Sequence, residues 1–313
     1  LSVGGLSAPV AQALQAAARR TGAVIYAAPA APIGPAFPVQ PLVGRVGLVA
    51  QSGVIGAAII DSARQLGLGI SSFVAVGNKA DVSSNDLFRY WQDDAGTDVV
   101  MCYLESFGNP SKFTRTARAL SQHKPVVAVK VGGSTADHWE EPEGWPPDAT
   151  AAALLEQTGV VRVDNLTQML FTANVLNSQP LPAGPRVAVL TNSWGPAWLA
   201  VDALKAAGLQ PGEPVDLSNE TSPEDFTTAL TEIYQSGEVD AVLVIYAPAI
   251  RAHYRRVGAA LLAAAHAPEA VTTVACKLGQ HPPGLLADDD IAIPEFPFPE
   301  EEALALGRGG RYA

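Results

Sequence analysis

Cysteine is almost absent from this chain, and so are the marks of secreted, zinc-binding and membrane proteins. Among 313 residues there are two cysteines, Cys102 and Cys276, and each lies within an apolar run. Two thiols in a chain of this length favour neither a disulfide scaffold nor a zinc site, so we expect both to be buried and reduced. The N-terminus has no secretory signal pattern, and no apolar run reaches membrane-spanning length. We therefore expect a cytoplasmic protein without a membrane partner.

Positive charge is also scarce. The chain has 20 Lys and Arg residues against 31 Asp and Glu residues, which gives a net charge of −11. A nucleic-acid backbone is bound through an excess of positive charge, so nucleic acid is excluded as a partner. Backbone amides can still bind a small anion locally. Glycine and proline are plentiful, with 28 and 25 residues, which indicates many short connections in a chain long enough for two domains.

Strand-like and helix-like segments alternate from residue 44 onward. Val46–Ala50, Ser72–Val76, Val99–Leu104 and Val126–Val131 are apolar, and amphipathic segments separate them. This alternation predicts the α/β class, with a doubly wound parallel sheet covered by helices on both faces. We expect the helix near residue 84 to be capped by Ser84 or by its neighbour Asn85.

The second half of the chain repeats the first. The segment PRVAVLTNSWGPAWLAVDALKAAGL is similar to GRVGLVAQSGVIGAAIIDSARQLGL, 141 residues earlier. In this register Arg186 corresponds to Arg45, and Ser193 corresponds to Ser52. A repeat this long indicates a duplicated domain. We expect domains at residues 44–180 and 181–313, linked by the segment SQPLPAG.

The turn after the first strand of each copy is the first candidate site. A small polar turn that opens a helix leaves backbone N–H groups pointing outward, and the helix dipole favours an anion such as phosphate there. Two such helix N-termini at one site would hold a phosphoryl group from both sides. The alternative is that Ser52 only caps a helix. The candidate phosphate-binding residues of the two turns are Gln51, Ser52, Gly53, Asn192, Ser193, Gly195 and Pro196.

Three further candidates lie after other strands of the first copy. Asn78 and Lys79 follow the second strand and form either part of the site or a plain turn. Glu105 ends the third strand. Its carboxylate could orient an imidazole or act as a base. The alternative is that it is an ordinary glutamate exposed to solvent at the end of a strand. His138 lies in the acidic loop GGSTADHWEEPEGWPPD. The histidines do not have the spacing of a metal site, so we expect no metal.

The order of motifs resembles the NDP-forming acyl-CoA synthetases, which include ADP-forming acetate–CoA ligase and, more remotely, the succinyl-CoA synthetase α subunit. The similar segments are GRVGLVAQSGVIGAAIID, FVAVGNKADVSSNDL, VVMCYLES, KPVVAVKVG, GVVRVDNLTQML and RVAVLTNSWGPAWLAVDAL. The resemblance implies two tandem flavodoxin-like domains. It also implies a link between an acyl phosphate, CoA and a nucleotide through a phosphorylated histidine on a mobile loop. In that scheme Glu105 steadies the histidine, and the turns at Ser52 and Ser193 receive the phosphoryl group.

The same resemblance implies cofactors and partners. CoA or acyl-CoA is the expected ligand, and ATP or ADP would act only through an ATP-grasp domain or subunit, in a homo- or hetero-oligomer. Residues 1–43 would be a remnant of the CoA-binding domain and its linker, without the usual glycine-rich start. Because the chain begins with LSVGG rather than Met, we expect the natural N-terminus to lie upstream.

One departure from the family pattern leaves three hypotheses open. The loop after KPVVAVKVG normally carries a Ser-His-Thr-Gly segment with the phosphorylated histidine, and no His-Thr-Gly occurs in this chain. The first hypothesis is a synthetase-like protein that binds CoA, acyl-CoA or a phosphoryl group but has an impaired phosphohistidine relay. The second is a non-catalytic regulatory or scaffold module that senses acyl-CoA beside an acetyltransferase or ATP-grasp partner. The third is an active acid–CoA ligase that uses His138.

Overall fold

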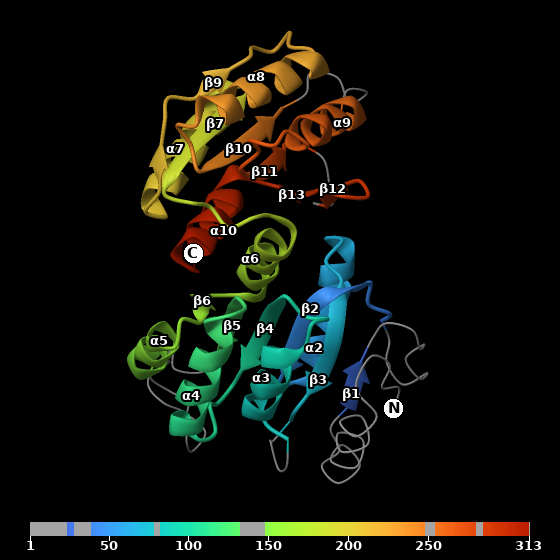
Figure 1. Cartoon of the computed structure of the whole chain (residues 1–313), viewed down its shortest axis with the longest axis vertical. Coiled ribbons are helices and arrows are strands. Elements are labelled where there is room, and N and C mark those ends of the chain that lie inside the picture. Colours follow the sequence, from blue (N-terminus) through green and yellow to red (C-terminus); the bar gives the residue numbers. More distant parts are fainter. Residues whose placement is uncertain are drawn as a thin grey trace. The chain divides into compact units, whose positions relative to one another are not determined.

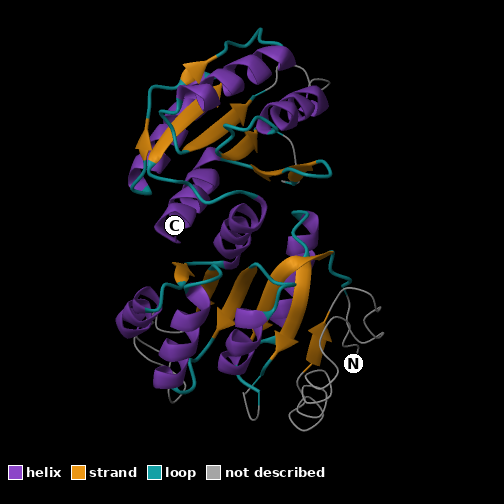
Figure 2. Cartoon of the chain, viewed as in Figure 1, coloured by secondary structure: helices purple, strands orange, loops and turns teal. Residues whose placement is uncertain are grey.

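The structure is a computed structural model that describes residues 24–27, 39–77, 82–131, 148–247, 254–279 and 284–312. The chain divides into two compact units, Leu1–Ala173 and Asn174–Ala313. Each unit contains a mainly parallel sheet with helices on both faces (Figures 1 and 2). The predicted α/β class with two flavodoxin-like units is confirmed.

The first sheet has the strand order β1-β3-β2-β4-β5-β6. Its five parallel strands therefore run 2-1-3-4-5 in chain order, which is the flavodoxin-like arrangement. The strand β1 pairs antiparallel with β3 and covers that edge, although its residues lie in the segment that we expected to be a domain remnant. The strands of this sheet are β1 (Val24–Ala27), β2 (Val43–Ala50), β3 (Ile70–Ala75), β4 (Val99–Leu104), β5 (Val126–Lys130) and β6 (Val161–Val163).

The second sheet repeats this order. Its path is β12-β13-β11-β10-β7-β8, and β9 also pairs with β7. Because β8 and β9 lie beside β7 as two short pieces, they together take the place that β3 takes beside β2. At the opposite edge β12 pairs antiparallel with β13. The strands are β7 (Arg186–Thr191), β8 (Gln210–Pro211), β9 (Val215–Asp216), β10 (Ala241–Tyr246), β11 (Thr272–Lys277), β12 (Leu285–Ala287) and β13 (Ala292–Phe296).

The described residues form nine helices, of which α10 follows the last strand and the others lie between strands. The helices α3 and α4 pack against each other in the first unit, as do α8 and α9, and α7 and α10, in the second. The helices are α2 (Gly53–Gln65), α3 (Ser84–Asp93), α4 (Pro110–Ser121), α5 (Asp148–Gln157), α6 (Leu166–Ser178), α7 (Trp194–Ala206), α8 (Pro223–Ser236), α9 (Tyr254–Ala265) and α10 (Pro299–Tyr312).

Local sequence explains where these helices begin and end. Ser52 is the N-cap of α2, and its Oγ accepts a hydrogen bond from the N–H of Ile55 at 3.4 Å. The N-cap of α3 is Ser83, so our prediction of Ser84 or Asn85 was wrong. Asp86 decides this position, because its carboxylate accepts a hydrogen bond from the N–H of Ser83 at 3.0 Å and so closes a capping box.

Each unit has its own apolar core between the sheet and one helix layer. In the first unit Phe88 meets Phe113 edge-on, with ring centroids 5.6 Å apart, and Trp91 is fully buried beside them. In the second unit Phe226 meets Tyr246 edge-on at 5.5 Å. These aromatic contacts hold α3 and α4, and α8, against the strands that lie beneath them.

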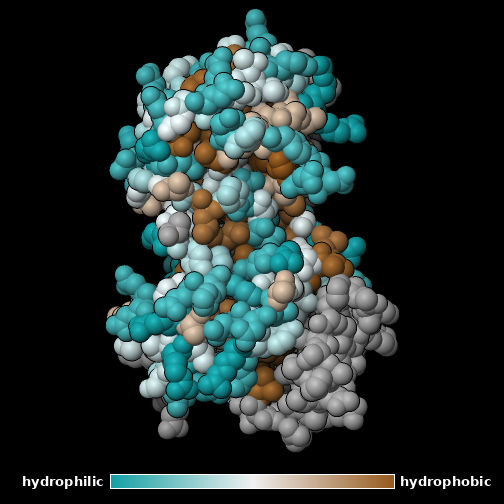
Figure 3. Space-filling view, in the orientation of Figure 1, coloured by the Kyte–Doolittle hydropathy of each residue, from teal (hydrophilic) through white to brown (hydrophobic). Residues whose placement is uncertain are grey.

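Two smaller predictions concern the thiols and the surface. Cys102 and Cys276 are both buried and neither forms a disulfide bond, as expected. Burial, followed by the charges of nearby glutamates, raises the pKa of Cys276 well above its usual range. Within the described ranges, no helix is both long enough and apolar enough to cross a membrane. The face drawn in Figure 3 is largely hydrophilic, with scattered apolar patches.

Candidate functional site

The carboxyl ends of the parallel strands carry the predicted site residues. After β2, the side chain of Gln51 is buried and turns sideways to the segment that follows β4. Its Oε1 accepts hydrogen bonds from the N–H of Glu105 and, at 2.8 Å, from the N–H of Ser106. Its Nε2 donates to the carbonyl oxygen of Ser106 at 2.7 Å. Gln51 therefore fixes the two neighbouring turns relative to each other.

The second unit contains the same clamp. Asn192 follows β7 and is buried, and its Oδ1 accepts a hydrogen bond from the N–H of Ala247 at 2.8 Å. Its Nδ2 donates to the carbonyl oxygen of Ala247 at 3.0 Å. Both amide side chains thus bind backbone at the end of the adjacent strand. Their contribution to a ligand site is to hold the turn in shape, because these hydrogen bonds already occupy both ends of each amide.

The turn after β2 leaves the N-terminus of α2 open to an anion. The first turn of this helix carries no acidic side chain, and Gly53 at its start is exposed. A Cβ atom on Gly53 would meet no described atom closer than Ala75 at 4.0 Å, so packing within the described residues does not require a glycine there. A glycine at this point lets a ligand approach the backbone N–H groups closely.

The turn after β7 has the same form with different side chains. Ser193 is the N-cap of α7, and its N–H donates to Oγ1 of Thr191 at 3.0 Å. The Ser193 side chain accepts no capping hydrogen bond from a backbone N–H of the described helix. Gly195 is exposed with open space around it in the described structure, and Pro196 has no N–H to satisfy. Trp194, also exposed, stands beside this opening.

In two other helices the N-terminus is closed, which means that a carboxylate of the helix itself bonds to the N-cap residue. In α3 the carboxylate of Asp86 bonds to its own N-cap, and Lys112 lies 2.9 Å from it. In α8 the carboxylate of Asp225 accepts a hydrogen bond from the N–H of Ser222 at 2.7 Å. These hydrogen bonds lower the pKa of Asp225, so it stays negative and repels anions. The open N-termini of α2 and α7 differ from these in lacking a carboxylate of their own.

A carboxylate lies beside the open N-terminus in one unit only. Glu105 is half-buried, and its backbone N–H is held by Gln51. Burial, and then the negative charge of Glu105, raise the pKa of the nearby Tyr103. The second unit has Ala247 at the equivalent position, where its N–H bonds to Asn192. Only the first unit can therefore place a carboxylate next to its helix N-terminus at this position.

Lys130 is a site residue that our reading of the sequence did not select. It ends β5 opposite Leu104, the last residue of β4, and its ammonium group donates to the carbonyl oxygen of Val131. The equivalent Lys277 ends β11 and forms an ion pair with Glu295. A lysine that ends an apolar strand, as in VVAVK, is the signal that could have found it. It places a largely buried cation at the same sheet edge as the open N-terminus of α2.

Three predicted site residues, Asn78, Lys79 and His138, lie outside the described residues. The described part of the chain contains no group of three or more His, Cys, Asp or Glu side chains that could hold a metal ion. The geometry therefore brings together Gln51, Ser52, Gly53 and Glu105 in one unit, and Asn192, Ser193, Gly195 and Pro196 in the other.

Comparisons with known proteins show what the chain is similar to. Residues 43–176 match the succinyl-CoA ligase like flavodoxin domain. An ADP-forming 4-hydroxybutyrate–CoA ligase of Nitrosopumilus maritimus is 27% identical over 244 residues, which cover 67% of this chain and 34% of that protein. ADP-forming acetate–CoA ligase I of Archaeoglobus fulgidus is 29% identical over 303 residues, which cover 86% of this chain and 42% of that protein.

A solved structure extends the fold match across both units. Acetyl-coenzyme A synthetase 1 of Ca. Korarchaeum cryptofilum, in complex with phosphate and ADP, superposes with a TM-score of 0.75 at 22% identity. The match covers 87% of this chain and 65% of that one. The chain spans between a third and a half of the length of the curated relatives above. In its motifs, its matching domain and these relatives, the chain is similar to the NDP-forming acyl-CoA synthetases, and residues 43–176 form the flavodoxin domain of the succinyl-CoA ligase type.

Proposed function

We propose that this chain binds a phosphoryl group, or the phosphates of CoA or acyl-CoA, at the N-termini of α2 and α7, and that its phosphohistidine relay is impaired. The observation that carries the proposal is the open N-terminus of α2, which a buried amide clamp holds and whose first turn has no acidic side chain of its own. Such a terminus offers backbone N–H groups and a positive dipole end to an anion.

Glu105 supports a role beyond simple anion binding. It sits where a carboxylate could orient an imidazole beside the bound phosphoryl group. In the second unit Ala247 replaces it. We therefore assign the chemistry of the family, where it persists, to the first unit, and simple anion binding to the second.

The family's names supply the expected ligands and partner. The relatives are named as ADP-forming CoA ligases, and one from Pyrococcus furiosus is named as an alpha subunit. We infer that CoA or acyl-CoA is the small-molecule ligand here. An ATP-grasp domain or subunit would supply the nucleotide in a homo- or hetero-oligomer.

A single added carboxylate tests the anion site. Gly53→Asp places a negative charge in the first turn of α2, as Asp86 does in α3, and Gly53→Asn is its uncharged control of the same shape. We expect Gly53→Asp to weaken CoA binding at least tenfold in calorimetry, while Gly53→Asn retains it. Equal binding by the wild type and both variants would overturn the assignment to α2. Gly195→Asp and Gly195→Asn repeat the comparison at α7.

A second candidate, the non-catalytic acyl-CoA sensor, is favoured by the absence of any His-Thr-Gly segment. Incubation with acetyl phosphate, with and without an ATP-grasp partner, separates both of these candidates from an active ligase by intact mass. We expect CoA binding without a gain of one phosphoryl mass. A phosphoryl adduct that disappears in His138→Ala would instead establish the active ligase that uses His138.

A further inference from the structure

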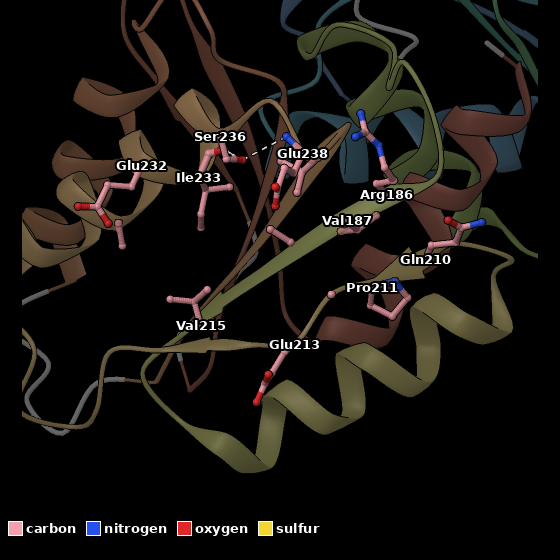
Figure 4. Close-up of a pocket in the computed structure, with 14 residues that line it drawn as sticks. Arg186, Val187, Gln210, Pro211, Glu213, Val215, Glu232, Ile233, Ser236 and Glu238 are labelled. Carbon is pink, nitrogen blue, oxygen red and sulfur yellow. Dashed lines mark hydrogen bonds between the residues drawn. The ribbon is translucent and has the colours of Figure 1, made fainter.

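A groove of about 560 Å³ lies along one edge of the second sheet, away from the site described above (Figure 4). Its floor is apolar and includes Val187 and Ala188 of β7 and Ala229 of α8. One wall is the broken edge formed by β8 and β9, and the other is α8 with the turn that follows it. A volume of this size is typical of pockets for small molecules.

The internal repeat shows what fills this place in the first unit. The register between the two copies is fixed by an ion pair that occurs in both. Arg45 bonds through Nε and Nη2 to the carboxylate of Asp98, and Arg186 bonds in the same way to Asp240. Each aspartate also donates its backbone N–H to the arginine's carbonyl oxygen at 2.8 Å. Strand residues counted from these pairs can therefore be compared directly.

In the first unit the equivalent groove is filled by an indole. Trp91 of α3 is fully buried and lies over β2 at Gly47. A Cβ atom on Gly47 would come within 2.7 Å of the Trp91 ring, so this glycine makes room for it. The indole Nε1 donates a hydrogen bond to Oγ of Ser72 on β3 at 2.8 Å. A flat ring with one N–H donor thus completes the core here.

In the second unit each of these residues is replaced and the ring is missing. Trp91 precedes Asp98 by seven residues, and Ile233 precedes Asp240 by the same number. Ala188 corresponds to Gly47 and lines the floor of the groove with Ile233. Glu213 corresponds to Ser72, because the register pairs Val46 with Ile70 in one copy and Val187 with Pro211 in the other.

The groove is also lined by negatively charged side chains. Glu213 from the broken edge, Glu232 from α8 and Glu238 from the following turn are all exposed and line the groove (Figure 4). The cation among its lining residues, Arg186, is bound to Asp240 and to the carbonyl oxygen of Gly237. The rim therefore remains negative around an apolar floor.

We propose that this groove binds a small aromatic amine. Its ring would lie over Ala188 and beside Ile233, where the repeat places the Trp91 ring in the other copy. Its ammonium group would face Glu213, which replaces the hydrogen-bond acceptor of that ring, and the other two glutamates. The apolar floor of the groove suits an aromatic ring, and its negatively charged rim suits a cation. This site is separate from the anion site at the helix N-termini and has the opposite charge preference.

Matched indole compounds test the proposal on the full chain. Tryptamine is a cation at neutral pH, and indole-3-acetate is an anion with the same ring. We expect tryptamine to bind at least tenfold more tightly than indole-3-acetate in calorimetry. Glu213→Gln leaves the groove's shape intact and should reduce this preference several-fold. Equal affinities for the two compounds, or no binding of tryptamine, would overturn the proposal.

A second variant tests the location. Ile233→Trp places an indole in the groove from within, as in the first unit, and Gln235→Trp adds one at an exposed position of the same helix. We expect Ile233→Trp to abolish tryptamine binding and Gln235→Trp to retain it, while both variants still bind CoA as the wild type does. Retained tryptamine binding in a folded Ile233→Trp variant would show that the amine binds elsewhere.

Discussion

The two α/β units share the hydrogen bonds that hold their first strands and turns in place, and they differ at the side of the sheet next to those strands. The amide clamps at Gln51 and Asn192, and the arginine–aspartate pairs at the start of the first strands, occur in both copies. The strand beside β2 is the continuous β3, whereas the two short pieces β8 and β9 lie beside β7, and Ile233 takes the place in the second unit that the buried Trp91 has in the first. The two copies have thus kept the hydrogen bonds that position the turns, and they differ in the residues that pack beside the first strand of each sheet.

The largest expected difference between the units comes from Trp91. Trp91→Ala removes a fully buried ring and its hydrogen bond to Ser72, so we expect the first unit to lose about 3–5 kcal/mol of unfolding free energy. Ile233→Ala trims a side chain that already borders an open groove, and it should cost the second unit only about 1 kcal/mol. Hydrogen exchange of β2 and β7 peptides, read by mass spectrometry, measures the two units separately. Equal losses would mean that the two positions are not structurally different.

The amide clamps should matter to a similar extent in both units. Gln51→Leu leaves the buried N–H groups of Glu105 and Ser106 without their acceptor, and Asn192→Leu does the same to Ala247. We expect each to cost about 2–3 kcal/mol in its own unit, since unsatisfied buried polar groups are expensive. The exposed Gln65→Leu serves as the control and should change little. Denaturant titration monitored by exchange in each unit provides the measurement.

The arginine–aspartate pairs should differ because one is more buried. The Asp240 side chain is 7% exposed, whereas that of Asp98 is 48% exposed. We expect Asp240→Asn to cost about 1–2 kcal/mol and Asp98→Asn less than about 1 kcal/mol. Urea unfolding of the two variants tests this order, and a larger loss from Asp98→Asn would contradict it.

The same pair gives the second unit an acid dependence. The hydrogen bond from Arg186, ahead of burial's opposing effect, lowers the pKa of Asp240 below its ordinary value of 3.8. Its stabilisation is therefore complete above that ordinary value and is lost as pH falls through the lower folded value. Stability measured from pH 6 down to about pH 2 should fall less steeply in Asp240→Asn than in the wild type. Parallel curves would show that Asp240 is not involved.

The smallest effect should come from the tryptophans of α7. Trp194 and Trp198 are about half-exposed and stack on each other, with ring centroids 6.2 Å apart. Because neither contributes a buried core ring, Trp198→Ala should change stability by less than about 0.5 kcal/mol. Thermal unfolding by circular dichroism checks this, and a loss as large as that of Trp91→Ala would show that α7 packs more tightly than its exposure indicates.

The sequence predicted the fold well because alternation and repetition are strong signals. Buried strands such as Val99–Leu104 are largely apolar. Arg45 and Ser52 of the first copy recur as Arg186 and Ser193 in the second. The capping role of Ser52 was foreseen as an alternative and is confirmed. The N-cap of α3 was predicted one or two residues too late. Ser83 and Ser84 are adjacent, and only the hydrogen bond between the Ser83 N–H and the Asp86 carboxylate tells them apart.

The site was harder to predict than the fold. A polar residue after a strand, such as Gln51, reads equally well as a ligand contact or as a clamp, and only the hydrogen bonds separate the two. Lys130 was passed over because a lysine at a strand end usually lies in solvent. The groove at Ile233 has no local signal, since an isoleucine on an amphipathic helix looks like an ordinary core residue.

The broken edge of the second sheet also bears on how the chain avoids pairing of its sheet edges with those of other molecules. An exposed strand edge offers a row of unpaired N–H and carbonyl groups that can pair with another molecule. In the first unit β1 covers the edge of β3. In the second, Pro211 and Pro214 remove two N–H donors within four residues, and Gly212 between them favours a kink. One copy therefore protects its edge by adding a strand, and the other by making its edge a poor template for aggregation.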